Sequence, residues 1–181
     1  FISLATFPVV AQLAVLAPIA VNLIPRYSKW ETALLPLSLF CFNSALAAIS
    51  TPLTNTLNAL GKVKINTYLM IMWTVLTWVL TPALAIKYGF VGVAYATAII
   101  ALSSVIPVMI VRHFTGFSIL NSFGKPAIAT FFMLLTSVFI KNLILNFVVS
   151  LFVFTVTLYL LTGQQLLKDV GHFYYALVKK K

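Results

Sequence analysis

Residues 33–64 read ALLPLSLFCFNSALAAISTPLTNTLNALGKVK, a run long enough to cross a bilayer yet rich in hydroxyl and amide side chains. At about 1.5 Å per residue, a helix over this run reaches roughly 40 Å. The polar side chains recur at helical spacings, so they form a stripe along one face of that helix. The stripe consists of Asn43, Ser50, Thr54 and Asn58, flanked by Ser44, Thr51 and Asn55.

Lipid penalises polar side chains, so we expect the stripe to face a bundle interior or a water-filled cavity. The simpler alternative is hydrogen bonding between packed helices. Pro52 removes one backbone hydrogen bond within the helix and predicts a kink. Gly61 predicts the end of the helix. Thr74 lies on a polar face of the next apolar run, which we expect to pack on or line the same interior. The substrate-cavity candidates are Asn43, Ser50, Thr54, Asn55, Asn58 and Thr74.

Composition restricts the class of protein. The chain has 181 residues, of which 62% are hydrophobic and 8% are charged. A soluble domain carries about 25% charged residues, so we expect a polytopic membrane protein. The net charge is +10, and the basic residues lie at the ends of apolar runs. This placement indicates that they set the membrane orientation and contact lipid headgroups, rather than bind nucleic acid. Cys41 is the only cysteine, which excludes a disulfide within the chain.

The apolar runs predict an all-α transmembrane helix bundle of about six spans over residues 1–163. The predicted spans are 1–24, 33–60, 65–86, 90–111, 126–145 and 147–162. Residues 164–181 place apolar side chains on one side and end in three lysines, which predicts an amphipathic tail.

Four further residues are expected to shape the bundle. Pro82 predicts a kink near the outer end of the third span. Gly89 predicts a tight turn before the fourth span. Gly92 and Ala96 are small residues four positions apart, a spacing that lets two helices approach closely.

The cations predict an orientation. If the Gly61 loop is cytoplasmic, eight cations lie on the inner side and four on the outer side. This excess agrees with the positive-inside rule and predicts a cytoplasmic C-terminus. The chain begins at Phe1 without the basic flank of a signal peptide, so we expect a further N-terminal part.

Side chains able to perform catalysis are scarce. Catalysis requires titratable groups within reach of one another. The chain offers two acids, Glu31 and Asp169, and two histidines, His113 and His172, all at predicted loops or boundaries. No metal-ligand spacing, phosphate-binding glycine loop or nucleophile–base pattern occurs. We therefore expect no enzyme and no metal or other cofactor. The amides and hydroxyls suit hydrogen bonding to sugars or coordination of Na⁺.

Two segments in order resemble a known family. Residues 57–64 read LNALGKVK, and after an apolar helix residues 87–98 read KYGFVGVAYATA. This pattern resembles the C-terminal part of polysaccharide-biosynthesis membrane proteins. These are the O-antigen and lipid-linked oligosaccharide flippases of the multidrug/oligosaccharidyl-lipid/polysaccharide exporter superfamily. The resemblance covers roughly residues 1–163. The family often has a Phe-Gly-x-x-Tyr-like run where this chain has IPRY at residues 24–27.

The resemblance implies the C-terminal lobe of a two-lobe exporter. Such a flippase moves a lipid-linked oligosaccharide or polysaccharide precursor across the cytoplasmic membrane by alternating access. The implied partners are that substrate, membrane lipids and the N-terminal lobe of the same protein. The substrate carries a pyrophosphate, and no cation lies at mid-membrane depth in this sequence. We therefore expect the charged contacts to lie in the other lobe.

Three alternatives stay open. A cation-coupled multidrug exporter of the same superfamily would usually need an intramembrane acid. A non-transporting membrane subunit of a polysaccharide synthesis complex would bury the polar stripe in helix contacts. A membrane glycosyltransferase or polymerase would need more acids than the sequence provides, and it would need a large extramembrane loop, which the sequence lacks.

Overall fold

The computed structural model describes residues 2–116, 123–140 and 142–163, and every regular element within them is a helix. The elements are α1 (Ile2–Leu23), the 3₁₀ helix η1 (Pro25–Ala33), α2 (Leu34–Ala59), α3 (Val63–Tyr88), α4 (Phe90–Leu102), α5 (Val105–Thr115), α6 (Lys125–Phe139) and α7 (Leu143–Thr162). The prediction of an all-α bundle is confirmed. The predicted tail, residues 164–181, lies outside the described residues.

Five helical segments of this part of the chain are long and apolar enough to cross a membrane. They are α1, η1 with α2, α3, α4 with α5, and α7. The sixth helix, α6, has 15 residues and is shorter. The chain is therefore a multi-pass membrane protein, and the described residues form five long helical segments and one short apolar helix.

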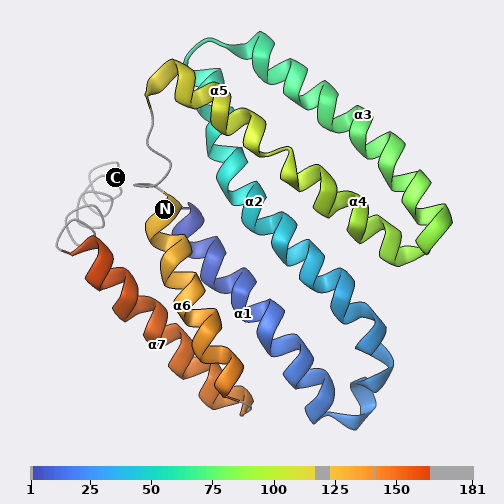
Figure 1. Cartoon of the computed structure of the whole chain (residues 1–181), viewed down its shortest axis with the longest axis vertical. Helices are drawn as coiled ribbons and strands as arrows, with labels where there is room; N and C mark the ends of the chain where they lie inside the picture. The colour runs from blue at the N-terminus through green and yellow to red at the C-terminus, as the bar shows by residue number, and fades with distance from the viewer. Residues whose placement is uncertain (1, 117–122, 141, 164–181) are drawn as a thin grey trace, which may run out of the picture.

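The central helix of the bundle is α2 (Figure 1). It packs against α1 on one side and against α4 and α5 on the other. Figure 1 shows α6 and α7 beside α1, and α3 beside α4. The polar residues of α2 are thus carried between two groups of helices.

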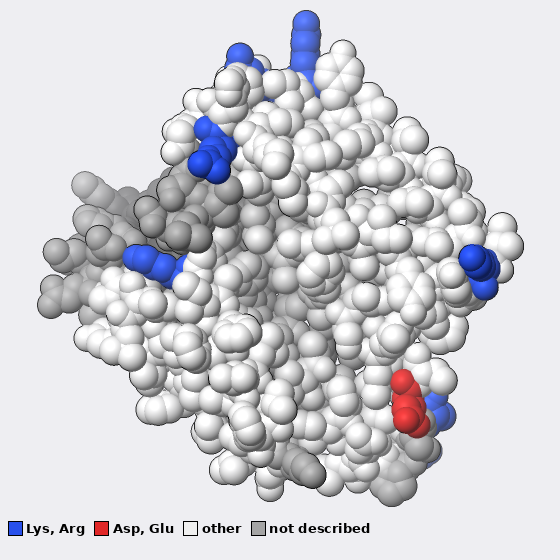
Figure 2. Space-filling model, in the orientation of Figure 1, with Lys and Arg blue, Asp and Glu red and all other residues white. Residues whose placement is uncertain are grey.

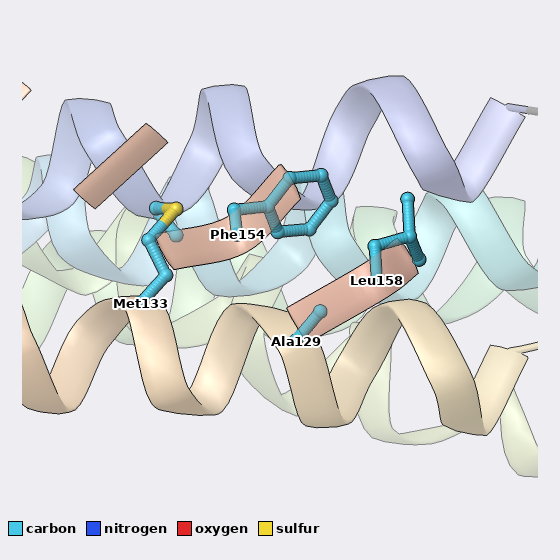
Figure 3. Packing of buried hydrophobic residues seen from close by; sticks show 5 residues of the cluster. Ala129, Met133, Phe154 and Leu158 are labelled. Atoms are coloured by element: carbon cyan, nitrogen blue, oxygen red, sulfur yellow. The ribbon is translucent and has the colours of Figure 1, made fainter. Parts of the chain in front are cut away.

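The core of the α1, α6 and α7 group is a small cluster of apolar side chains. Figure 3 shows Ala129 and Met133 of α6 directed toward Phe154 and Leu158 of α7, and Ala11 of α1 completes the cluster. Each pair is four residues apart, so each presents one helix face. Lipid is as apolar as these side chains, so close van der Waals packing stabilises the contact rather than removal from water.

The predicted end of the second span at Gly61 is confirmed. Gly61 has φ 71°, and its backbone N–H donates to the carbonyl of Asn58 at 3.0 Å. The N–H of Lys62 donates to the carbonyl of Leu57 at 2.9 Å. These two bonds form a Schellman motif, in which glycine takes the left-handed position without a steric penalty.

Proline does not end the helices that carry it at mid-length. α2 runs through Pro52, and α3 runs through Pro82 to Tyr88. Gly89 follows with φ 63° and begins the turn to α4, which agrees with the predicted turn. Gly92 is buried against the end of α3, as the small-residue spacing predicted.

The fourth predicted span, 90–111, lies within one membrane-length segment, Phe90–Thr115, but this segment is not a continuous α-helix. It is divided at Ser103 and Ser104 into α4 and α5. Pro107 has no N–H to donate to the carbonyl of Ser103, so that carbonyl accepts from the N–H of Ile106 at 2.9 Å instead. The tighter turn interrupts the α-helix at this point.

The predicted boundary between the fifth and sixth spans, at 145–147, is also wrong. α6 ends at Phe139, and α7 begins at Leu143. Asn142 caps α7, because its side-chain oxygen accepts from the N–H of Ile144 at 3.1 Å and of Leu145 at 3.2 Å. Asparagine at this position satisfies backbone donors that no helical carbonyl can reach.

Candidate functional site

The predicted polar stripe of α2 divides into two faces. On the inner face, Ser50 and Thr54 are buried and Asn43 is half-buried. The other members are exposed. This outer face consists of Ser44, Thr51, Asn55 and Asn58. Adjacent residues of a helix differ by about 100° in direction, so side chains one position apart reach different surroundings.

The inner face lines a small cavity between α2, α3 and the junction of α4 with α5. Its volume is about 160 Å³. The lining residues are Asn43, Ala47, Ser50, Trp73, Ile100, Ala101 and Ser104. The break between α4 and α5 therefore borders the cavity, because Ser104 belongs to that break.

One hydrogen bond joins α3 to the helix break. The indole Nε1–H of Trp73 donates to the hydroxyl of Ser103 at 2.7 Å, and that hydroxyl donates to the carbonyl of Ile100 at 2.6 Å. The bond connects the indole ring that lines the cavity to the junction between α4 and α5. A buried indole N–H normally has such a partner.

Two polar side chains of the cavity are left without protein partners. Neither the amide of Asn43 nor the hydroxyl of Ser104 hydrogen-bonds to a described residue, although Ser104 is only 8% exposed. The cavity is large enough to admit water, which could bond to both groups. Ligand pockets usually measure about 300–1,000 Å³, so this cavity is too small for an oligosaccharide.

The outer face of α2 presents unpaired polar groups at the surface of a membrane helix. Ser44, Thr51 and Asn55 make no side-chain hydrogen bond with the described part of the chain. A surface of this kind is costly against hydrocarbon, because the groups find no partner there. Water or another protein surface would provide one.

Thr74 is not brought to this site. It is exposed on α3, and its hydroxyl donates to the carbonyl of Met70 at 2.9 Å. Thr67 and Thr77 donate in the same way to carbonyls four residues earlier. A threonine that bonds its own helix tolerates lipid, so these residues give no reason to expect a cavity on α3.

Asn58 has a structural contact. Its side-chain oxygen accepts from the side-chain amide of Asn66 at 2.9 Å. Asn66 lies on α3, one turn after the Gly61 loop, so the bond holds the ends of the two helices together. Of the six predicted cavity residues, Asn43 and Ser50 line the inner cavity, whereas Thr54, Asn55, Asn58 and Thr74 do not.

Sequence reasoning missed a second buried polar cluster, between α1, α6 and α7. The side-chain amide of Gln12 donates to the hydroxyl of Ser150, which donates to the carbonyl of Asn146. The amide of Asn146 donates to the carbonyls of Ser137 at 2.8 Å and Ile140 at 2.7 Å. Gln12 and Ser150 are 138 positions apart, so no local signal pairs them.

Each amide of this cluster keeps one unpaired atom. The side-chain oxygens of Gln12 and Asn146 are buried and have no hydrogen-bond partner. The two N–H donors of the Asn146 amide bond to carbonyls at the end of α6, where the last carbonyls of a helix lack partners from a following turn. The cluster therefore closes the short helix α6 against α7.

The site contains no charged side chain. Glu31 is the one acidic residue among those described, and it lies in η1. No group of three histidine, cysteine or acidic side chains within the described ranges is placed to hold a metal ion. The arrangement offers neutral hydrogen-bond donors and acceptors within a membrane bundle. Comparison of the chain with known protein families, curated proteins and solved structures finds no match.

Proposed function

We propose that the chain is part of a membrane transporter that moves a lipid-linked oligosaccharide or polysaccharide precursor across the cytoplasmic membrane by alternating access. One observation carries the proposal: Ser44, Thr51 and Asn55 form an unpaired polar face on the central helix of a membrane bundle. Water in a transport pathway would hydrogen-bond to this face, and so would the hydroxyl groups of a sugar.

The uncharged side chains of the outer face suit binding of a sugar better than binding of an ion. Amides and hydroxyls both donate and accept hydrogen bonds, as sugar hydroxyls do. The segments at residues 57–64 and 87–98 that resemble polysaccharide flippases support the same class. In this proposal the pyrophosphate is bound by a second, N-terminal lobe, the protein lies in the cytoplasmic membrane, and its C-terminus is cytoplasmic.

Cysteine accessibility tests the proposal. In a protein in which Cys41 is replaced by alanine, single substitutions Thr51→Cys and Asn55→Cys would be treated with a membrane-impermeant maleimide from each side. A matched control is Phe152→Cys on α7, since Phe152 is 66% exposed on an apolar face. We expect labelling at 51 and 55 and none at 152, and we expect labelling at 55 to stop translocation of a lipid-linked oligosaccharide into proteoliposomes.

A second candidate is a non-transporting membrane subunit of a polysaccharide synthesis complex. Two residues of the polar stripe favour it, because Thr54 is buried and Asn58 bonds to Asn66 at 2.9 Å across the α2–α3 contact. A permanent partner would then cover the outer face. Failure of the maleimide to label Thr51→Cys and Asn55→Cys from either side would support this candidate and contradict the transport pathway.

A further inference from the structure

Three basic side chains meet where α2 ends, α3 begins and α5 ends. Lys62 lies in the turn between α2 and α3, Lys64 lies in the first turn of α3, and Arg112 lies in the last turn of α5. All three are exposed. We call this set, Lys62, Lys64 and Arg112, the basic patch. The helices that carry it are 26, 26 and 11 residues long, so their other ends lie far from it.

One direct contact joins two of the chain segments that carry the patch. The Nζ atom of Lys62 lies 5.0 Å from the ring centroid of Phe114, which joins the α2–α3 turn to the end of α5. The ring of Phe114 also stacks edge-on with His113 at 5.4 Å between centroids. A cation over an aromatic face is attracted to it, so Lys62 has a preferred position rather than a free one.

Buried apolar side chains fix the three helices beneath the charges. Leu57 of α2, Leu69 of α3 and Val111 of α5 belong to one cluster, and they are 0%, 4% and 1% exposed. Val111 directly precedes Arg112. Lys64 and Arg112 are therefore carried by packed helices, and Lys62 lies in the short turn that joins two of them.

No acid neutralises the patch within the described residues. Glu31 is the acidic residue described, and η1 places it before the opposite end of α2. Figure 2 shows basic side chains at both ends of the molecule, with the acidic side chain beside basic ones at one end only. Among the residues that the structure describes, the patch is thus a site of uncompensated positive charge at the end of apolar, membrane-length helices.

We propose that the basic patch binds the phosphate of an anionic membrane lipid, with Arg112 and Lys62 as the main contacts. Clusters of basic residues directly beside a membrane helix attract anionic headgroups. Arginine offers a planar pair of donors that matches two phosphate oxygens, and lysine adds a compact charge. The exposed ring of Phe114 suits the boundary between headgroups and acyl chains. This binding does not depend on the proposed transport function.

Lipid titration of the purified full chain tests the proposal. Native mass spectrometry would measure the affinity for phosphatidylglycerol and for phosphatidylcholine of the parent chain and of Lys62→Gln/Arg112→Gln. Each cation near a membrane surface contributes about fivefold in affinity, so the double variant should bind phosphatidylglycerol about 25-fold more weakly. Binding of phosphatidylcholine should not change.

The matched control is Lys29→Gln/Lys87→Gln, which removes two cations from η1 and from the last turn of α3. It should keep the affinity of the parent chain for phosphatidylglycerol, and circular dichroism should show equal helix content in both double variants. Equal loss in the two variants would mean a general effect of net charge and would overturn the site. Displacement of phosphatidylglycerol by glycerol 3-phosphate at equal concentration would also overturn it, because the site would then recognise free phosphate.

Discussion

A Cβ atom on Gly92 would lie 2.0 Å from the carbonyl oxygen of Leu84, because the first turns of α4 press against the last turns of α3. The obstacle is backbone, which cannot rotate away as a side chain can. Gly92→Ala should therefore force α3 and α4 apart. Overpacking costs about 1–3 kcal/mol, and we expect the upper end of that range. Thermal unfolding in detergent would measure the loss.

The control for this substitution is Ile99→Ala on the same helix. Ile99 is exposed, so its truncation leaves no internal cavity and should change the melting temperature less. Equal melting temperatures of the parent chain and Gly92→Ala would contradict the close approach of the two helices.

A second prediction concerns the bond between Gln12 and Ser150. Gln12→Leu and Ser150→Ala should each lower the free energy of unfolding, and the double variant should lose less than the sum of the two. Hydrogen bonds between membrane helices contribute about 0.5–1.5 kcal/mol, and the coupling should fall in that range. Unfolding in mixed micelles would measure all four members of the cycle.

The comparison for that cycle pairs Gln12→Leu with Thr67→Ala. Thr67 lies on α3 and donates to its own helix at Val63, so the two sites share no partner. Their effects should add. A coupling between Gln12 and Ser150 no larger than this background would show that the bond contributes nothing to stability.

A third prediction separates two tryptophans of α3. Trp73→Phe removes the indole donor that bonds Ser103 at 2.7 Å, so it should lower the free energy of unfolding by about 1 kcal/mol. Trp78 is 76% exposed and makes no such bond in the described structure, so Trp78→Phe should have little effect. Equal losses in the two variants, measured by denaturant unfolding, would contradict the role of Ser103.

Local patterns predicted the features that short-range chemistry determines. The limits of α2 follow from an apolar run that ends in glycine, and the predicted range 33–60 differs from Leu34–Ala59 by one residue at each end. The close approach of two helices at Gly92 was predicted from the spacing of small residues alone. Such features depend on residues within a turn or two of each other, so the sequence contains the whole signal.

Other features depend on contacts that the sequence does not display. Thr54 and Asn55 are neighbours in sequence, yet one is buried and the other exposed, because only the position of α4 and α5 separates their surroundings. The pairing of Gln12 with Ser150 joins α1 to α7, the first and the last of the described helices. The break at Ser103 had a local signal in Pro107, four residues later, but the continuous apolar run around it concealed the signal.

The last prediction tests the boundary that the sequence misplaced. Asn142→Ala removes the acceptor for the N–H groups of Ile144 and Leu145, and loss of an N-cap costs about 1 kcal/mol. Asn142→Asp keeps an acceptor and adds a negative charge at the positive end of α7, so its stability should equal or exceed that of the parent chain. Asn22→Ala removes an exposed asparagine near the end of α1 and serves as the control.

The order of thermal stability among the three variants shows whether Asn142 acts as a cap. If Asn142 acts as a cap, thermal unfolding should place Asn142→Asp at or above the parent, Asn22→Ala close to the parent, and Asn142→Ala below both. If Asn142→Asp and Asn142→Ala lose equal stability, the side-chain oxygen is not the stabilising group. The start of α7 would then depend on the buried amide of Asn146 and its bonds to Ser137 and Ile140, which both variants leave in place.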